Sequence, residues 1–190
     1  MRKMCGLDDL AQQRTLNYFT SCLRDFVVNL NGMDTALSQR LTELGIVLPA
    51  MSGPFGAYVP AKRVGNLIYV AGQLPMREGK LAAVGQVPSQ CSLDEAKAAA
   101  RLCVINALAA VKAIEGSVDH LTGVVRVGAF VSSDNGFTEQ PKVANGASEF
   151  LLELFGEPGK HVRAAVGVNV LPLNASVEVE FIFVMSDAQG

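Results

Sequence analysis

The chain has 190 residues, 49% of them hydrophobic and 18% charged, which is enough for one well-buried core but short for two. Its formal net charge of −2, without any run of lysine or arginine, argues against general affinity for nucleic acid. The sequence contains no apolar run of the roughly 20 residues that a membrane-spanning helix needs. Four dispersed cysteines and two histidines argue against a structural zinc site, and reduced cysteines would fit a cytoplasmic protein.

The first 32 residues differ from the rest of the chain. Their leucines and phenylalanines could line one side of a helix, but charged residues interrupt any signal-peptide core. Two interpretations stay open: residues 1–32 are an extension that is not native, with Met33 as the natural start, or they form a docking helix. We expect residues 33–190 to form a single domain.

The elements that follow carry recognisable start and stop signals. A helix is expected over residues 35–44, because Asp34 can cap its start and Gly45 its end. A capping box, in which Ser92 and Glu95 bond each other's backbone amides, opens a long alanine-rich helix. The other expected elements, read from apolar runs between turn signals, are strands at 58–61, 67–70 and 81–84, a strand at 123–131, and a helix that begins near Pro141 and ends at Gly156.

Residues 161–184, HVRAAVGVNVLPLNASVEVEFIFV, alternate between apolar and other side chains in two runs. This period of two is typical of half-buried strands, and residues 171–174 supply turn chemistry between the runs. The pattern predicts an antiparallel hairpin, with the valines of the first run on the core side and Asn169 opposite Glu178.

In that hairpin the outer face would carry Arg163 beside two small residues, Ala165 and Gly167, with Glu178 and Glu180 on the adjoining strand. A guanidinium group presents a planar fork that matches a carboxylate ligand. An ordinary ion pair on a solvated strand face is the alternative interpretation. Both histidines, His120 and His161, are expected at the surface, because neither has a nucleophile pattern nearby.

The order of elements from residue 58, β-β-β-α-β-α-β-β, predicts an α+β fold. Two helices would cover one face of a mixed sheet in a two-layer sandwich. The opposite face would need cover wherever it is apolar, and self-association is one solution.

Two segments together resemble a known family. Residues 65–75, GNLIYVAGQLP, resemble the pattern G-N-x-I-x-x-S-G-Q-x-P, and residues 163–178 resemble R-x-x-V-x-V-x-x-L-P-x-x-x-x-x-E. These are motifs of the YjgF family, also called RidA or the reactive-intermediate deaminase family; older names are endoribonuclease L-PSP and translation inhibitor. The resemblance covers roughly residues 54–184. It implies a chorismate-mutase-like fold, a homotrimer with a ligand cleft at each subunit interface, and no metal or organic cofactor.

The resemblance also assigns site residues. The family's carboxylate-binding arginine corresponds to Arg163, its water-orienting glutamate to Glu178, a tyrosine near the start of the sheet to Tyr58, and an asparagine of the second helix to Asn145. Tyr58 could instead pack at an interface, and Asn145 could only bond backbone groups. Glu180 would replace Glu178 if a bulge shifted the register.

Two positions depart from the family pattern: Ala71 stands where the family has serine, and Ala165 where it often has cysteine. Both remove a polar group from the expected substrate-binding cleft. Three functions therefore remain open. The first is hydrolysis of enamines or imines such as 2-aminoacrylate to 2-oxo acids and ammonia, and the second is a trimer that only binds small carboxylates. The third, a ribonuclease or translation inhibitor, is disfavoured by the acidic balance and the missing basic groove.

Overall fold

The structure is a computed structural model that describes residues 36–51 and 57–186. The proposed cap Asp34 and both interpretations of residues 1–32 lie outside this part. The unit that begins at Leu37 is considered by itself.

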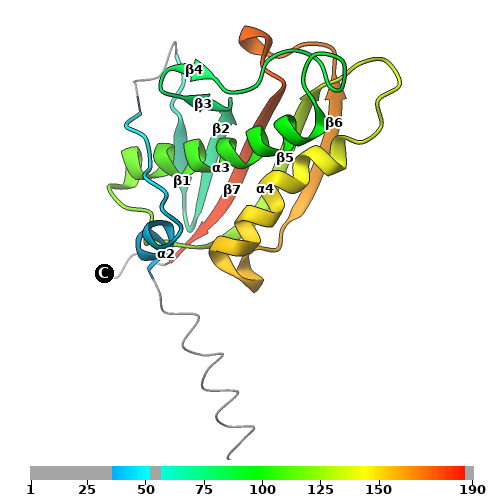
Figure 1. The fold of residues 1–190 in the computed structure, drawn as a ribbon. Coiled ribbons are helices and arrows are strands. Elements are labelled where there is room, and N and C mark those ends of the chain that lie inside the picture. The colour runs from blue at the N-terminus through cyan, green and yellow to red at the C-terminus, as the bar shows by residue number, and fades with distance from the viewer. Residues whose placement is uncertain (1–35, 52–56, 187–190) are drawn as a thin grey trace, which may run out of the picture. The chain divides into compact units, whose positions relative to one another are not determined.

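A five-stranded mixed sheet forms the centre of the fold (Figure 1). Its strands lie in the order β1-β2-β7-β5-β6, and only β5 and β6 are parallel. The strands are β1 Ala61–Val64, β2 Leu67–Gln73, β5 Leu121–Ser132, β6 Val162–Val168 and β7 Val177–Met185. A separate two-stranded hairpin consists of β3 Met76–Arg77 and β4 Lys80–Leu81. Gly79, at the tip of this hairpin, has a φ of 76°.

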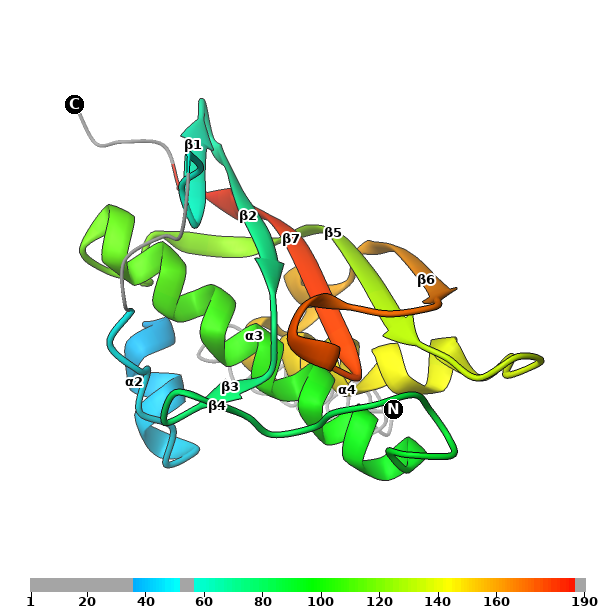
Figure 2. The same cartoon turned by 90° about the horizontal axis from the view of Figure 1, so that it is seen from above.

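The two long helices cover one face of the sheet, as Figure 2 shows, and the α+β class is confirmed. The helices and short 3-10 turns are α2 Leu37–Glu43, α3 Leu93–Glu115, α4 Gln140–Phe155, η1 Glu157–Gly159 and η2 Pro172–Asn174. The capping box of α3 is present, since Ser92 N donates to Glu95 Oε2 at 2.9 Å and Glu95 N donates to Ser92 Oγ at 3.3 Å. In the described residues, no helix has the length and hydropathy to cross a membrane.

The short helix α2 packs against α4 and begins at Leu37, two residues later than expected. Its first turn is capped by a distant side chain. Ser38 N donates to Asp119 Oδ1 at 2.7 Å and Ser38 Oγ donates to Asp119 Oδ2 at 2.9 Å. An acceptor 81 residues away in sequence has no local signal, so the pattern could not reveal it.

The predicted hairpin of residues 161–184 is wrong. Strands β6 and β7 are not neighbours, because β5 lies between them: Val127 of β5 is opposite Arg163 on one side and opposite Phe181 on the other. Alternation tells which side chains share a face of a strand but not which strand lies next to it. Strand β5 forms hydrogen bonds along both of its edges, with β7 on one side and β6 on the other.

The predicted faces of β6 are also wrong. Arg163, Ala165 and Gly167 pair with buried β5 residues and therefore face the helices, whereas Val162 and Val166 lie on the other side and are 66% and 46% exposed. The valines were expected to mark the core. They lie instead in an edge strand, on the face of the sheet that none of the described helices covers.

The core lies between the helices and the sheet. Its largest fully buried side chains include Ile68, Leu108, Phe150, Leu151, Phe181 and Phe183. The helices approach closely at Gly146 of α4, where an added Cβ would lie 1.9 Å from the carbonyl oxygen of Lys97 in α3. The opposite side of the sheet, which we call the open face, carries Val64, Tyr69, Val162, Val166, Ile182, Glu178 and the ion pair of Arg126 with Glu180.

Candidate functional site

Arg163 projects from the edge strand β6 toward α4. Its Nη1 donates to Asn145 Oδ1 at 2.9 Å and to Ser148 Oγ at 2.9 Å. Asn145 and Ser148 are three residues apart on α4 and therefore share one helix face. The structure thus brings Arg163 and Asn145 together. It adds Ser148, which the sequence analysis missed; its one signal is the spacing from Asn145.

The remaining edge of the Arg163 guanidinium is open. Both hydrogens of Nη1 are used, whereas Nε and Nη2 have no hydrogen-bond partner in the part of the chain that the structure describes. These two nitrogens present parallel N–H groups, the geometry that binds both oxygens of a carboxylate. Ala165, two residues further along the same face of β6, is half-buried and adds no polar group.

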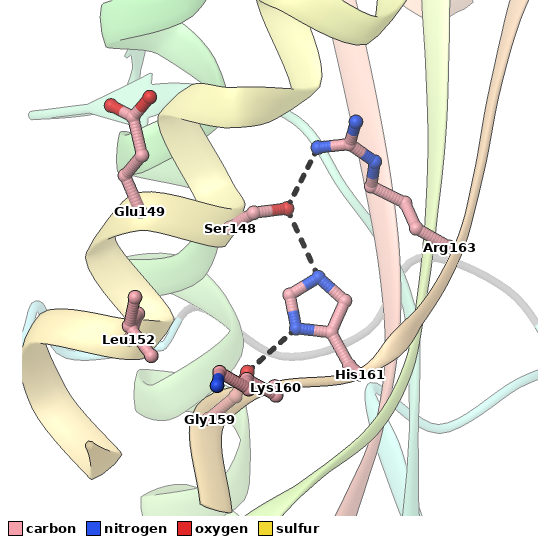
Figure 3. A pocket seen from close by; sticks show the side chains of 7 residues that line it. All are labelled: Ser148, Glu149, Leu152, Gly159, Lys160, His161 and Arg163. Atoms are coloured by element: carbon pink, nitrogen blue, oxygen red, sulfur yellow. Dashed lines mark hydrogen bonds between the residues drawn. The ribbon is translucent and has the colours of Figure 1, made fainter. Parts of the chain in front are cut away.

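A histidine next to this arginine is hydrogen-bonded on both ring nitrogens (Figure 3). His161 Nδ1 lies 2.7 Å from the carbonyl oxygen of Gly159, and Nε2 lies 3.0 Å from Ser148 Oγ. His161 is partly exposed, as expected of a residue at the surface, but its two ring hydrogen bonds were not foreseen. Together with Arg163 these residues line a shallow depression of about 470 Å³.

Glu178 lies on the open face, in β7, and rests directly against the backbone of β2. A Cβ placed on Gly72 would be 1.9 Å from Glu178 Oε1. The register between β2 and β7 shifts between Val70 and Gln73, so Ala71 and Gly72 form a bulge there. Such bulges re-aim side chains and are frequent beside active sites. Ala71 itself is half-buried.

Burial raises the pKa of the Glu178 carboxyl, and the neighbouring Glu180 raises it further. Glu180 forms an ion pair with Arg126, whereas Glu178 has no ion pair among the described residues. The bulge lies in β2 and leaves Glu178 and Glu180 on one face of β7. A carboxylate without a cation beside it is available to bind water or a proton.

Arg163 and Glu178 lie on opposite faces of the sheet, which corrects the expectation that they share one. Arg163 is opposite Val127, whose side faces the helices, and Glu178 is opposite Phe130, whose side is open. One chain therefore carries two separate clusters of candidate residues, which we call half-sites. The first is Arg163 with Asn145, Ser148 and His161; the second is Glu178 with the bulge at Gly72.

Tyr58 lies in the irregular segment before β1 and is 58% exposed. Its side chain has no hydrogen-bond partner within residues 36–51 and 57–186. Two residues later, the carbonyl oxygen of Pro60 accepts from Ala71 N at 3.0 Å, so the segment runs close to the bulge. Tyr58 thus lies two residues from a backbone hydrogen bond to the bulge, and among the described residues it has no hydrogen bond to Arg163.

Comparison with known proteins gives a consistent picture. Residues 38–185 match the family described as "YjgF/chorismate_mutase-like, putative endoribonuclease". A crystal structure of the Agrobacterium tumefaciens protein Atu1372, of unknown function, is 43% identical, covers 83% of this chain and 97% of its own, and superposes with a TM-score of 0.71. A 2-iminobutanoate/2-iminopropanoate deaminase from Dermatophagoides farinae is 31% identical over 141 residues, which cover 74% of this chain and 94% of its own. E. coli TdcF with bound serine is 26% identical, with a TM-score of 0.51, 70% of this chain and 92% of its own covered.

Proposed function

Because the chain belongs to the YjgF/RidA family, we propose that it hydrolyses imines of small 2-oxo acids to the 2-oxo acid and ammonia. The observation that carries this proposal is the Nε and Nη2 edge of Arg163, which has no hydrogen-bond partner among the described residues, whereas Nη1 is held by Asn145 and Ser148. A guanidinium fork fixed in this way is suited to the carboxylate that every 2-imino acid has. The iminobutanoate deaminase similarity and the serine-bound neighbour support the same ligand size.

The two half-sites would be joined by assembly. The open face exposes Val162 and Val166 of the edge strand β6, and Glu178 on the same face has no cationic partner among the described residues. A second copy lying across this face would cover the apolar side chains and could bring a cation to Glu178. We propose a homotrimer, in which each cleft takes Arg163 from one copy and Glu178 from the next. This arrangement would also explain why one chain separates them.

In the proposed reaction the ligand carboxylate binds Nε and Nη2 of Arg163, and Glu178 accepts a hydrogen bond from the attacking water. The water oxygen bonds to the carbon of the protonated imine while its proton passes to Glu178, and the C=N electron pair moves to nitrogen. Glu178 then returns that proton to the amine. An oxygen lone pair then forms the C=O bond while the C–N electron pair departs with nitrogen as ammonia, and the hydroxyl proton passes to the Glu178 carboxylate as the 2-oxo acid forms. A raised pKa suits a carboxyl group that both takes and gives a proton near neutral pH.

A second candidate is a trimer that binds small carboxylates without turning them over. Alanine at positions 71 and 165 favours it, because neither side chain can hydrogen-bond a reacting group. The deaminase needs Glu178 to act on water, whereas the carboxylate binder needs only Arg163. Loss of Glu178 would therefore stop turnover in a deaminase and leave ligand binding by a carboxylate binder unchanged.

The test generates 2-aminoacrylate in situ and measures 2-oxo acid release with and without the protein. Acceleration supports the deaminase, and binding of pyruvate without acceleration supports the carboxylate binder. Arg163→Lys keeps the charge and loses the fork, and since bonds to charged groups contribute about 1.5–3 kcal/mol each, binding should weaken roughly tenfold or more. Arg77→Lys, in the exposed β3–β4 hairpin, is the matched control. A trimeric Arg163→Ala variant that binds and turns over like the parent would refute the site.

A further inference from the structure

The hydrogen bonds beside Arg163 connect Gly159, His161, Ser148 and Arg163 in series. With a neutral imidazole, only one assignment of donors and acceptors satisfies all of them. The carbonyl oxygen of Gly159 can only accept, so His161 Nδ1 carries the ring hydrogen and donates to it. The Arg163 guanidinium can only donate, so Ser148 Oγ accepts from Nη1. The hydroxyl hydrogen of Ser148 is then left to donate to His161 Nε2. Each group in the chain fixes the orientation of the next.

The first group of this hydrogen-bond series, the backbone of Gly159, packs against α4, the helix that carries Ser148. Gly159 is buried, and a Cβ there would lie 2.4 Å from the carbonyl oxygen of Leu151 in α4. The backbone that accepts from His161 is therefore packed directly on α4, the helix that carries Ser148. Both hydrogen bonds of the histidine ring thus lead to α4 or to backbone packed on it.

Other charges around the depression have partners elsewhere. Lys160 Nζ is 2.8 Å from Glu157 Oε2, and Glu149 Oε2 is 2.8 Å from Lys97 Nζ. Arg163 has no ion pair among the described residues, and its Nη1 is held only by neutral oxygens. Its orientation consequently depends on those hydrogen bonds and not on a counter-ion.

We propose that His161 and Ser148 form a positioning pair for Arg163, which holds the Nη1 edge so that the Nε and Nη2 edge faces the ligand carboxylate. The inference rests on the proposed role of Arg163 as carboxylate anchor but not on the hydrolysis itself. An arginine side chain has many rotamers, and bidentate binding needs one of them. Residues that lock the rotamer of a binding group by hydrogen bonding raise its affinity without touching the ligand. His161 would thus orient Arg163 indirectly, through the Ser148 hydroxyl.

The test is a double-mutant cycle read by binding. Pyruvate is titrated onto the full-length protein and followed by ligand-observed NMR, which reaches millimolar dissociation constants. His161→Ala should weaken binding about tenfold, close to the loss of one net hydrogen bond. In an Arg163→Lys background, where there is no fork to aim, the same change should have almost no effect. His161→Gln, whose amide can still accept from Ser148, should recover most of the affinity.

Several outcomes decide the question. His120→Gln, the same substitution at the other, exposed histidine, should bind pyruvate like the parent. Equal losses from His161→Ala in both backgrounds would overturn the positioning pair, because a mere tether between β6 and α4 gives additive effects. Ser148→Ala should reproduce His161→Ala, and thermal unfolding checks that each variant is folded. A parent that binds pyruvate but hydrolyses no imine would refute the deaminase alone, and a parent that does not bind pyruvate would refute both proposals.

Discussion

The two faces of the sheet have similar sequences and different surroundings. On the helix side, Val127 and Phe181 are 0% and 2% exposed, whereas Val162 and Val166 on the open face are 66% and 46% exposed. All four belong to strands rich in valine and phenylalanine. An apolar strand face in the sequence therefore does not tell whether the helices of the same chain cover it.

The candidate site is divided in the same way. The anchor Arg163 is fixed on the covered side by α4, where neighbouring helix residues can hold its guanidinium. Glu178 lies on the open side against the β2 bulge, where nothing in the described chain pairs with it. A function that needs both groups would be coupled to assembly. The predictions below test that coupling, beginning with the largest expected effect.

The first prediction contrasts a covered and an uncovered apolar residue. Phe150→Ala removes a ring that is 0% exposed and lies under Arg101, with 3.8 Å from the guanidinium carbon to the ring centroid. It should lower the free energy of unfolding by about 3–5 kcal/mol. Val166→Ala should lower the stability of the isolated chain by less than about 1 kcal/mol. Urea unfolding at equal, low protein concentration measures both, and a similar loss for the two would contradict the division into faces.

The second prediction concerns the open face in the assembled protein. Val166→Asp places a charge among exposed apolar side chains and should leave the chain folded but monomeric, because burying an unpaired carboxylate is costly. Sedimentation and circular dichroism separate loss of assembly from loss of fold. Val47→Asp is the control, since Val47 is 88% exposed and lies outside the sheet. A trimeric Val166→Asp variant would show that this surface is not the interface.

The elements of the fold were predictable wherever the determining groups are close in sequence. The capping box at Ser92 and Glu95 marks the start of α3, and Gly156 marks the end of α4, as the sequence predicted. Strand β5 is apolar on both faces, as is typical of a central strand, and it is flanked on both sides. These signals act within a few residues, so a single sequence carries them.

The arrangement of strands and the site network could not be predicted in this way. The order β7-β5-β6 depends on which strands compete for the edges of β5, a tertiary choice that alternation does not encode. The resemblance supplied Arg163, Asn145 and Glu178, yet the hairpin hypothesis put the arginine on the wrong face. His161 and Ser148 were missed because their contact spans 13 residues and depends on the packing of β6 beside α4.

The third prediction uses the bulge. Gly72→Ala places a methyl group where Glu178 Oε1 now lies, at a calculated 1.9 Å, so the carboxylate must move. Pyruvate binding at Arg163 should be nearly unchanged, because the covered half-site is untouched. Imine hydrolysis should slow by up to about 100-fold, the cost of a displacement of about 1 Å in a catalytic group. Unchanged hydrolysis would remove Glu178 from the proposed reaction, whereas parallel losses of binding and turnover would indicate a general distortion of β2.

The smallest effect expected is on stability as a function of pH. Because burial, and then Glu180, raise the pKa of Glu178 in the folded chain, the folded state holds this proton more tightly than the unfolded state does. The stabilising contribution is present below the unfolded pKa and is lost as pH rises through the folded pKa. Glu178→Gln, which stays uncharged, should therefore match the parent at about pH 4. It should exceed the parent at neutral pH by less than about 1 kcal/mol, since the group is only partly buried.

Thermal unfolding of the isolated chain, obtained in the Val166→Asp background, measures this difference without the contribution of a second copy. Glu180→Gln is the comparison on the same strand and face. It breaks the ion pair with Arg126, so it should lower stability slightly at neutral pH, opposite in sign to Glu178→Gln. The same pair of variants in the assembled protein then sharpens the contrast between faces. If a second copy brings Arg163 close to Glu178, the gain from Glu178→Gln should shrink or reverse on assembly; an identical gain in both states would argue that no cation of another copy reaches the open face.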